Sequence, residues 1–237
     1  MDITPAFAAA LRKRRDSQAT ALIERFRPSL SSGPVLDYGC GQGAFVGQLL
    51  AAGLDGWGCD LSLPSAMGER VEVLPSPWAL PKRTPPGGWG TIALLDVLEH
   101  HPYPGEFLAT LPHSRFLLVK VPLCTGPIGT GATTLARLGW AGILESLFLL
   151  DAAPHQVFFT RQGLEATALP AHWKLNEFFP LADVGSELPE RIRGSLAGIA
   201  SNRLVKPALR GVGAAVAASA RYWADTAAFL FERTRSS

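Results

Sequence analysis

An acidic residue and three glycines at alternate positions are the residues of this sequence whose spacing best suits chemistry. The segment VLDYGCGQG at residues 35–43 places Asp37 two positions before Gly39, and Gly41 and Gly43 follow. A short apolar run, a glycine-rich turn and a helix-period pattern predict a strand, a tight turn and a helix. Such a turn lets a ligand approach the backbone, and the helix directs free N–H groups at it. We therefore expect a nucleotide-binding site here.

The acid helps to distinguish two classes of nucleotide. Gly39, Gly41 and Ala44 also satisfy the GxGxxA pattern of dinucleotide-binding folds, so the glycines alone do not decide. The carboxylate of Asp37 would repel a pyrophosphate, whereas it suits a positive amine or sulfonium. At these residues the sequence resembles the class I S-adenosylmethionine-dependent methyltransferases, whose first motif has the form hhDhGCGxG.

A second segment, DVLEH at residues 96–100, adds to the resemblance, because many small-molecule methyltransferases carry (D/E)VLEH after the fourth strand. The resemblance implies that Asp96 lines the cofactor site and that His100 faces the reacting centre. Methyl transfer is an in-line displacement, so the protein has chiefly to align donor and acceptor. A hydroxyl acceptor also loses a proton, which an imidazole can take. We expect His100 to be this base, with His101 and His155 as substitutes; a structural role is the alternative.

Further cofactor contacts are expected after the second and third strands. Asp60 ends the run WGCD, where its two oxygens match a ribose diol, although a helix N-cap is the alternative. Residues 76–80 occupy the place where the family lines its adenine pocket, usually with an acid that this sequence lacks. The expected cofactor-binding residues are Asp37, Tyr38, Gly39, Cys40, Gly41, Gly43, Asp60, Leu61, Ser76, Trp78, Asp96 and Val97.

These residues require a parallel sheet that brings the ends of several strands together. Apolar runs predict strands at 35–37, 57–60, 71–74, 91–96, 116–121, 173–179 and 226–233. The resemblance implies an α/β, Rossmann-like, doubly wound sheet of seven strands in the order 3-2-1-4-5-7-6, the last strand antiparallel. Helices are expected at 44–52, 106–111 and 161–168, the last following Thr160 as N-cap in a segment similar to the family's HxxFFT.

The whole chain, 1–237, is expected to be a single methyltransferase domain with four parts. An N-terminal helix within 1–29, stopped by Pro28 and by the residues 31–33 ahead of the first strand, lies over the cofactor cleft or simply packs on the sheet. The cofactor-binding half covers 30–122. An insertion at 123–154 forms a lid over the substrate, or instead a dimer surface or core helix, and 155–237 forms a C-terminal half with helices and the last strand.

The composition agrees with one enzyme-sized α/β domain. The chain has 237 residues with 47% hydrophobic content and a formal charge of +2, so nothing calls for nucleic acid. The basic run at 12–15 is a solvated helix face or, alternatively, a phosphate or membrane patch. Three cysteines without metal spacing indicate a reducing cytoplasm and no metal site. No signal sequence or membrane span is expected. We expect the chain to be a monomer or a homodimer.

We expect S-adenosylmethionine-dependent methyl transfer to a small, partly apolar acceptor, most readily at an oxygen, with S-adenosylhomocysteine as product. An NAD-dependent oxidoreductase is a second hypothesis, but none of the three tyrosines has a lysine four residues later, as a hydride-transfer pair would need. A third is a non-catalytic protein that binds the same cofactor and regulates or scaffolds a partner.

Overall fold

The computed structural model describes residues 5–61, 68–76, 79–125, 155–181 and 226–234. Trp78, nearly all of the predicted lid insertion and the helical stretch before the last strand lie outside the described residues. No helix in the described part of the chain is long and apolar enough to cross a membrane. The predicted cytoplasmic location stays a prediction.

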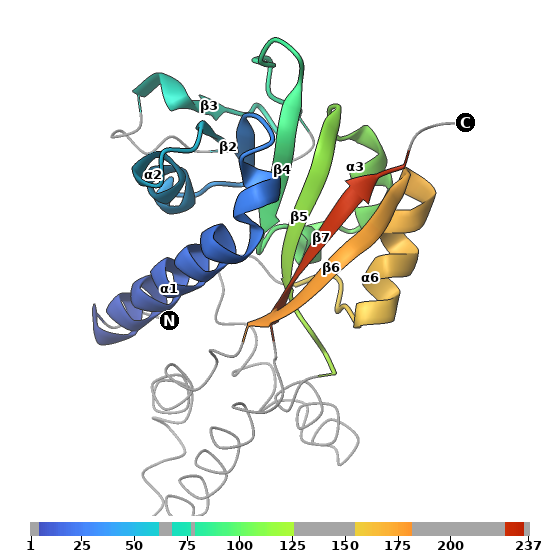
Figure 1. Cartoon of the computed structure of the whole chain (residues 1–237). Helices are drawn as coiled ribbons and strands as arrows, with labels where there is room; N and C mark the ends of the chain where they lie inside the picture. Colours follow the sequence, from blue (N-terminus) through green and yellow to red (C-terminus); the bar gives the residue numbers. More distant parts are fainter. Residues whose placement is uncertain (1–4, 62–67, 77–78, 126–154, 182–225, 235–237) are drawn as a thin grey trace, which may run out of the picture.

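One sheet of seven strands organises the described chain (Figure 1), and its order is β3-β2-β1-β4-β5-β7-β6. The strands are β1 Val35–Tyr38, β2 Gly56–Asp60, β3 Val71–Val73, β4 Trp89–Leu95, β5 Ser114–Pro122, β6 Trp173–Leu181 and β7 Thr226–Arg233. The pairs β1–β2, β2–β3, β1–β4 and β4–β5 are parallel, whereas β7 runs antiparallel to β5 and β6. The predicted order and the antiparallel last strand are confirmed.

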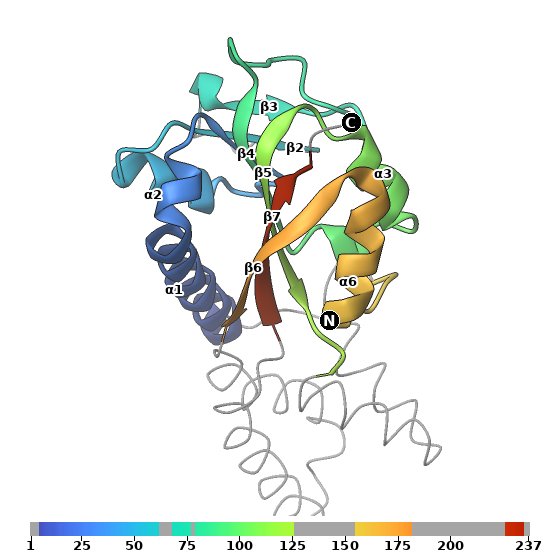
Figure 2. The same ribbon diagram turned by 45° about the vertical axis from the view of Figure 1, so that its right-hand side comes forward.

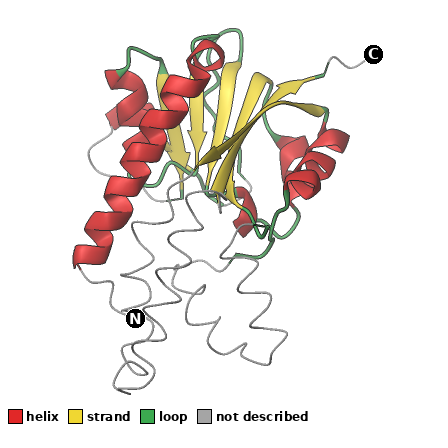
Figure 3. Ribbon diagram, turned by 60° about the horizontal axis from the view of Figure 1, so that its bottom comes forward, coloured by secondary structure: helices red, strands yellow, loops and turns green. Residues whose placement is uncertain are grey.

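Helices cover both faces of the sheet, as Figures 2 and 3 show. On one face lie α1 Pro5–Leu30 and α2 Ala44–Ala51; on the other lie α3 Pro104–Thr110 and α6 Arg161–Ala168. Short 3-10 helices are η1 Gly68–Arg70, η2 Leu98–His100 and η3 Leu169–Ala171. Because both faces are covered, β4 and β5 read as nearly continuous apolar runs rather than alternating ones.

The N-terminal helix ends close to where the sequence predicted. Pro28 and residues 31–33 were expected to stop the helix, and α1 ends at Leu30, between the proline and that segment. A proline inside a helix lacks its N–H and clashes with the preceding turn, so the backbone leaves helical geometry at Phe26, with φ −104° and ψ 15°. Phe26 and Leu30 are both buried against the sheet. Burial of these side chains keeps the last turn in place despite the proline.

The parallel register gathers the predicted site residues at one edge. Tyr38, the last residue of β1, lies opposite Cys59 of β2 and Leu94 of β4. The glycine turn, Asp60 and Asp96 therefore follow directly from neighbouring strand ends. Ligands of doubly wound sheets bind outside the carboxyl ends of the strands, so this edge is where a cofactor site is expected.

Candidate functional site

The glycine turn after β1 has the backbone conformation that the sequence predicted. Gly39, Gly41 and Gly43 have φ of 78°, 52° and 73°, a region that residues with a Cβ rarely adopt. The N–H of Gly39 donates to the carbonyl of Cys59 over 2.8 Å, which ties the turn to β2. A Cβ on Gly39 would lie 2.6 Å from Cγ2 of Val97. Gly39 is therefore required both by its φ and by the loop that follows β4.

Asp60 at the end of β2 contacts the same turn. Its Oδ2 accepts a hydrogen bond from the N–H of Gly41 over 2.8 Å. The carboxylate thus stands beside the glycine backbone, where a nucleoside bound over the turn would place its sugar. A ribose diol that binds both oxygens of Asp60 has to share or displace this hydrogen bond.

Asp37 lies beneath the turn and is only 3% exposed. Its pKa is raised to about 7, first by burial and then by the neighbouring carboxylate of Asp60, while the ammonium of Lys120 acts in the opposite direction. Near neutral pH the apo protein therefore holds Asp37 partly protonated. A cation placed next to this carboxyl would favour its ionised form.

A buried lysine, which the sequence analysis did not single out, sits at the centre of this edge. Lys120 of β5 is 3% exposed. Its Nζ donates to Oδ2 of Asp96 over 2.7 Å and to Oε1 of Gln18 over 2.8 Å. Gln18 comes from α1, so the N-terminal helix reaches the strand ends and takes part in the site. The Nε2 of Gln18 is buried and has no hydrogen-bond partner among the described residues.

Asp96 is held in an unusual backbone conformation. Its φ is +57°, which is uncommon for a residue other than glycine. Burial alone would raise its pKa, but the ammonium of Lys120 and, to a smaller extent, the guanidinium groups of Arg14 and Arg15 lower it. Asp96 is therefore ionised at neutral pH. Strained residues of this kind occur at binding sites, where the surrounding structure enforces them.

Two predicted contact residues turn their side chains into the protein interior. The hydroxyl of Tyr38 donates to the carbonyl of Ala79 over 2.8 Å, and its ring packs against Phe107 with centroids 5.2 Å apart. Cys40 is buried with Val46 and Val71. Burial, with the nearby carboxylates, raises the pKa of the Cys40 thiol to about 12, so it stays neutral. Both side chains therefore pack in the interior, where the thiol of Cys40 lies 3.9 Å from the carbonyl oxygen of Gly41 in the turn.

The remaining predicted adenine and cofactor contacts are partly accessible. Leu61, directly after Asp60, is 51% exposed, and Ser76 is half-buried. Val97 is half-buried and reaches Gly39, as described above. The contacts of these residues with a cofactor stay predictions.

The structure separates the three candidate bases. His100 and His155 are half-buried neighbours whose ring centroids lie 4.9 Å apart. His101 is buried instead and stacks on Phe107, with centroids 3.9 Å apart and planes at 14°. Burial, together with His100, lowers the pKa of His101. His100 and His155 therefore share one location, whereas His101 belongs to the core.

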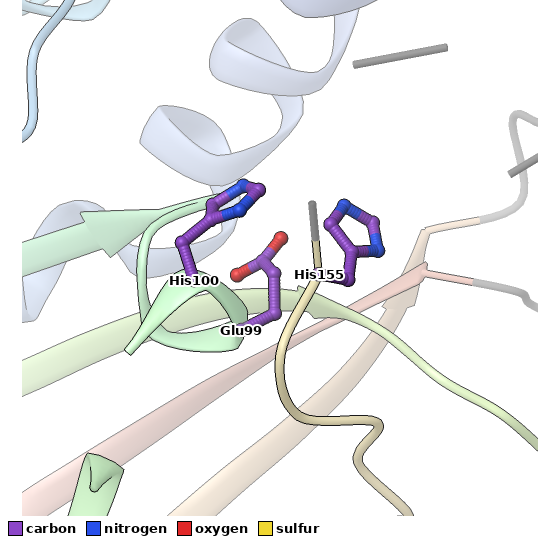
Figure 4. Close-up of side chains that lie close together, drawn as sticks. All are labelled: Glu99, His100 and His155. Carbon is purple, nitrogen blue, oxygen red and sulfur yellow. The ribbon is translucent and has the colours of Figure 1, made fainter. Parts of the chain in front are cut away.

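Glu99 joins these two histidines, which the sequence analysis did not foresee. One potential ligand atom from each of Glu99, His100 and His155 lies within 4.8 Å of those of the other two. In Figure 4 the carboxylate of Glu99 lies between the two imidazole rings. The DVLEH motif contained this glutamate, but only the folded chain shows that His155 reaches it from a different segment.

The sequence of residues 11–119 matches a family described as a methyltransferase domain. This segment is a methyltransferase domain. It contains the glycine turn, all three carboxylates of the site and the DVLEH segment. The match and the sheet order together confirm the class I methyltransferase prediction. No curated protein matches this sequence.

Solved structures, among them methyltransferases, resemble the fold of this chain. The magnesium protoporphyrin IX methyltransferase of Synechocystis PCC 6803, solved with bound S-adenosylhomocysteine, is 14% identical with a TM-score of 0.57; the match covers 99% of this chain and 90% of that one. A cyclopropane synthase of Mycobacterium tuberculosis is 18% identical, with a TM-score of 0.58 and coverages of 90% and 84%.

A phosphoethanolamine N-methyltransferase of Haemonchus contortus, solved with phosphomonomethylethanolamine and S-adenosylhomocysteine, also resembles the methyltransferase domain. It is 17% identical with a TM-score of 0.54, and the match covers 92% of this chain. This chain spans about half of that protein's length, since the match covers 53% of it. At these identities the likeness establishes the fold.

Proposed function

We propose that this chain transfers the methyl group of S-adenosylmethionine to an oxygen atom of a small, partly apolar acceptor. The acceptor oxygen forms a bond to the methyl carbon while the carbon–sulfur bond breaks. The electron pair of that bond stays on sulfur, which leaves as S-adenosylhomocysteine, and the acceptor's proton passes to a base. The observation that carries the proposal is the buried carboxylate of Asp37 beneath the glycine turn of a methyltransferase domain.

The charge of the site supports this cofactor over a dinucleotide. Asp37, Asp60 and Asp96 all stand at the edge where the ligand would bind. Of these three carboxylates, Asp96 forms an ion pair with Lys120. A pyrophosphate would meet this negative charge at close range, whereas the sulfonium and ammonium of S-adenosylmethionine are attracted by it. In addition, two of the structural neighbours described above were solved with S-adenosylhomocysteine.

Asp60, Asp96 and the N-terminal helix have separate roles in the proposal. Asp60, which already accepts from Gly41, would bind the ribose hydroxyls. Asp96 and Lys120 would stand at the methionine end of the ligand. There the carboxylate of Asp96 would accept hydrogen bonds from the ligand's ammonium group. The unpaired Nε2 donor of Gln18 would supply a hydrogen bond to the ligand's carboxylate. The N-terminal helix would thus contribute to cofactor binding as well as to packing.

His100 would act as the base for the acceptor, in keeping with the role that the sequence implies. It is half-buried beside His155, in the short helix η2 that directly follows Val97. Val97 in turn lies against Gly39 of the glycine turn. Proton removal by a positioned imidazole typically contributes about 10²–10⁴-fold to the rate. His101, packed on Phe107, is a weaker candidate for this role.

The test is methyl transfer from labelled S-adenosylmethionine to a panel of hydroxyl-, amine- and thiol-bearing small molecules. We expect turnover with a hydroxyl acceptor and loss of turnover in Asp37→Ala, because the variant binds the donor poorly. His113→Gln, at an exposed histidine between α3 and β5, is the matched control. Transfer to amines alone would contradict the oxygen acceptor, and full turnover by Asp37→Ala would contradict the role of this carboxylate.

A further inference from the structure

We propose that Glu99, His100 and His155 bind one divalent transition-metal ion beside the glycine turn. Their potential ligand atoms, one per residue, all lie within 4.8 Å of one another. Two imidazoles and one carboxylate are ligands that Zn²⁺, Mn²⁺, Fe²⁺ and Co²⁺ share, and this set leaves coordination positions open. Figure 4 shows the three side chains converging from two segments of the chain.

Backbone hydrogen bonds hold the two segments together without any ion. The N–H groups of Gln156 and Val157 both donate to the carbonyl of Glu99, over 2.8 and 3.1 Å. The side-chain Nε2 of Gln156 donates to the carbonyl of His100 over 3.1 Å. These three bonds tie the segment that carries His155 directly to the turn that carries the other two ligands.

A second anchor lies a few residues further on. The N–H of Cys124 donates to the carbonyl of Phe159 over 2.9 Å, and Leu123 forms a parallel bridge with Phe159. Phe159 and Leu123 are both buried. The segment after His155 is therefore fixed to the end of β5, and the place of His155 follows from the fold.

Burial favours a cation at this place. Glu99 is 1% exposed, and a buried carboxylate is expected to be paired with positive charge or to coordinate a metal. Two half-buried imidazoles stand beside it, with ring planes at 67°. A divalent ion is bound by neutral imidazoles and a carboxylate without placing two imidazolium charges side by side.

The cluster needs only a small adjustment to close on an ion. Ligand atoms about 2.0–2.2 Å from one ion lie roughly 3.0–3.5 Å from each other when they occupy neighbouring positions. The separations of up to 4.8 Å are therefore up to about 1.5 Å too wide for neighbouring ligand positions. Ion binding would have to close this gap by rotation of side chains, of which those of His100 and His155 are half-buried.

The role of the ion in catalysis rests on the proposed function, whereas metal binding itself does not. An ion at this place would take an acceptor oxygen into an open coordination position and lower the pKa of its hydroxyl. His100 would then be a ligand rather than the base, and the more acidic hydroxyl of the bound acceptor would release its proton to solvent water. The two roles of His100 differ in one measurable respect, since only the metal site makes turnover sensitive to a chelator.

The test uses the full chain after removal of metal by a chelator and dialysis. We expect Mn²⁺ and Co²⁺ to bind with a stoichiometry of one in calorimetry, and at least tenfold more weakly in Glu99→Gln and His155→Gln. His113→Gln and His172→Gln, at exposed histidines, are the controls and should bind as the parent chain does. Because Glu99 is buried, circular dichroism checks its variant's fold, and half-buried His155 supplies an independent variant.

Two results would overturn the site. One is that the parent chain binds neither Mn²⁺ nor Co²⁺, or that folded His155→Gln binds these ions as tightly as the parent chain does. The other is thiolate-to-cobalt charge-transfer absorption, which would assign the ion to a cysteine. Binding of S-adenosylhomocysteine is measured on the same samples, so that loss of the metal site is distinguished from failure of the proposed function.

Discussion

At the scale of single residues, the acidic side chains of the site were predictable from the sequence, but their environments were not. Asp37, Asp60 and Asp96 all lie at the strand ends where they were expected. Lys120 interrupts an apolar strand, and its partner Gln18 lies 102 positions away, so no local pattern connects them. The helix α1 has to be docked on the sheet before the lysine has a partner. Long-range polar pairs of this kind depend on tertiary structure.

The raised pKa of Asp37 predicts a pH-dependent gain in stability for Asp37→Asn. Folding moves this pKa from 3.8 to about 7, so the native state favours the protonated form. The protonated carboxyl therefore adds to the free energy of unfolding. This contribution is complete below about pH 4 and is lost as pH rises through 7. We expect Asp37→Asn to be more stable than the parent chain at pH 8, by about 2–4 kcal/mol, with a smaller difference at pH 5.

Urea denaturation of both proteins at the two pH values measures this difference. Asp55→Asn, an exposed aspartate, is the matched control. An equal effect of Asp37→Asn at pH 5 and pH 8 would show that the carboxyl is not buried in the way described.

Lys120 is expected to stabilise the chain mainly by neutralising Asp96. Replacing Lys120 by Met leaves that carboxylate without its ammonium, and we expect a loss of about 3 kcal/mol. This is the lower end of the cost for breaking a buried ion pair, because the Asp96 side chain is 32% exposed. A double variant that also carries Asp96→Asn should recover part of the loss. Additive losses in thermal or urea denaturation would mean that the pair is not coupled.

At the scale of elements, the strands and the helices expected at 44–52, 106–111 and 161–168 were predictable, and their bounds shifted by at most two residues at an end. Seven apolar runs became seven strands, and β7 has the predicted bounds, Thr226–Arg233. Pro28 and residues 31–33 were predicted to stop α1, and the helix runs two residues past the proline, where burial of Leu30 holds its last turn. A proline signals a break in helical hydrogen bonding, while packing decides whether the helix resumes after it.

Thr160 caps α6 as predicted, and its removal should weaken this element. Its Oγ1 accepts from the N–H of Gly163 over 2.9 Å. We expect Thr160→Ala to lower the free energy of unfolding by about 1 kcal/mol. Thr167→Ala, in the body of the same helix, is the comparison and should cost less. Equal losses in urea denaturation would argue against a capping role.

The turn after β1 should tolerate no side chain at Gly39. Gly39→Ala combines positive φ with a contact of 2.6 Å to Val97, so we expect a loss of about 1–3 kcal/mol and at least tenfold weaker binding of S-adenosylhomocysteine. Gly53→Ala is the control, since Gly53 has φ +75° but nothing within 4 Å of an added Cβ. If both variants bind the ligand equally well, the turn is not part of the cofactor site.

At the scale of the whole molecule, the fold follows from the sheet order, but the acceptor does not. The neighbours with this fold include a magnesium protoporphyrin IX methyltransferase, a cyclopropane synthase and a phosphoethanolamine N-methyltransferase. The resemblance seen in the sequence predicted the fold and the cofactor edge, because strand ends and a glycine turn are local features. The cluster of Glu99 with His155 joins distant segments and emerges only from the folded chain.

The central claim is that the acidic edge binds S-adenosylmethionine rather than a dinucleotide. Calorimetric titration of the full chain with S-adenosylhomocysteine and, separately, with NAD⁺ tests it most directly, and Asp37→Ala serves as the matched variant. We predict stoichiometric binding of S-adenosylhomocysteine, at least tenfold weaker binding by Asp37→Ala, and no binding of NAD⁺. Stoichiometric binding of NAD⁺ without binding of S-adenosylhomocysteine would contradict the account.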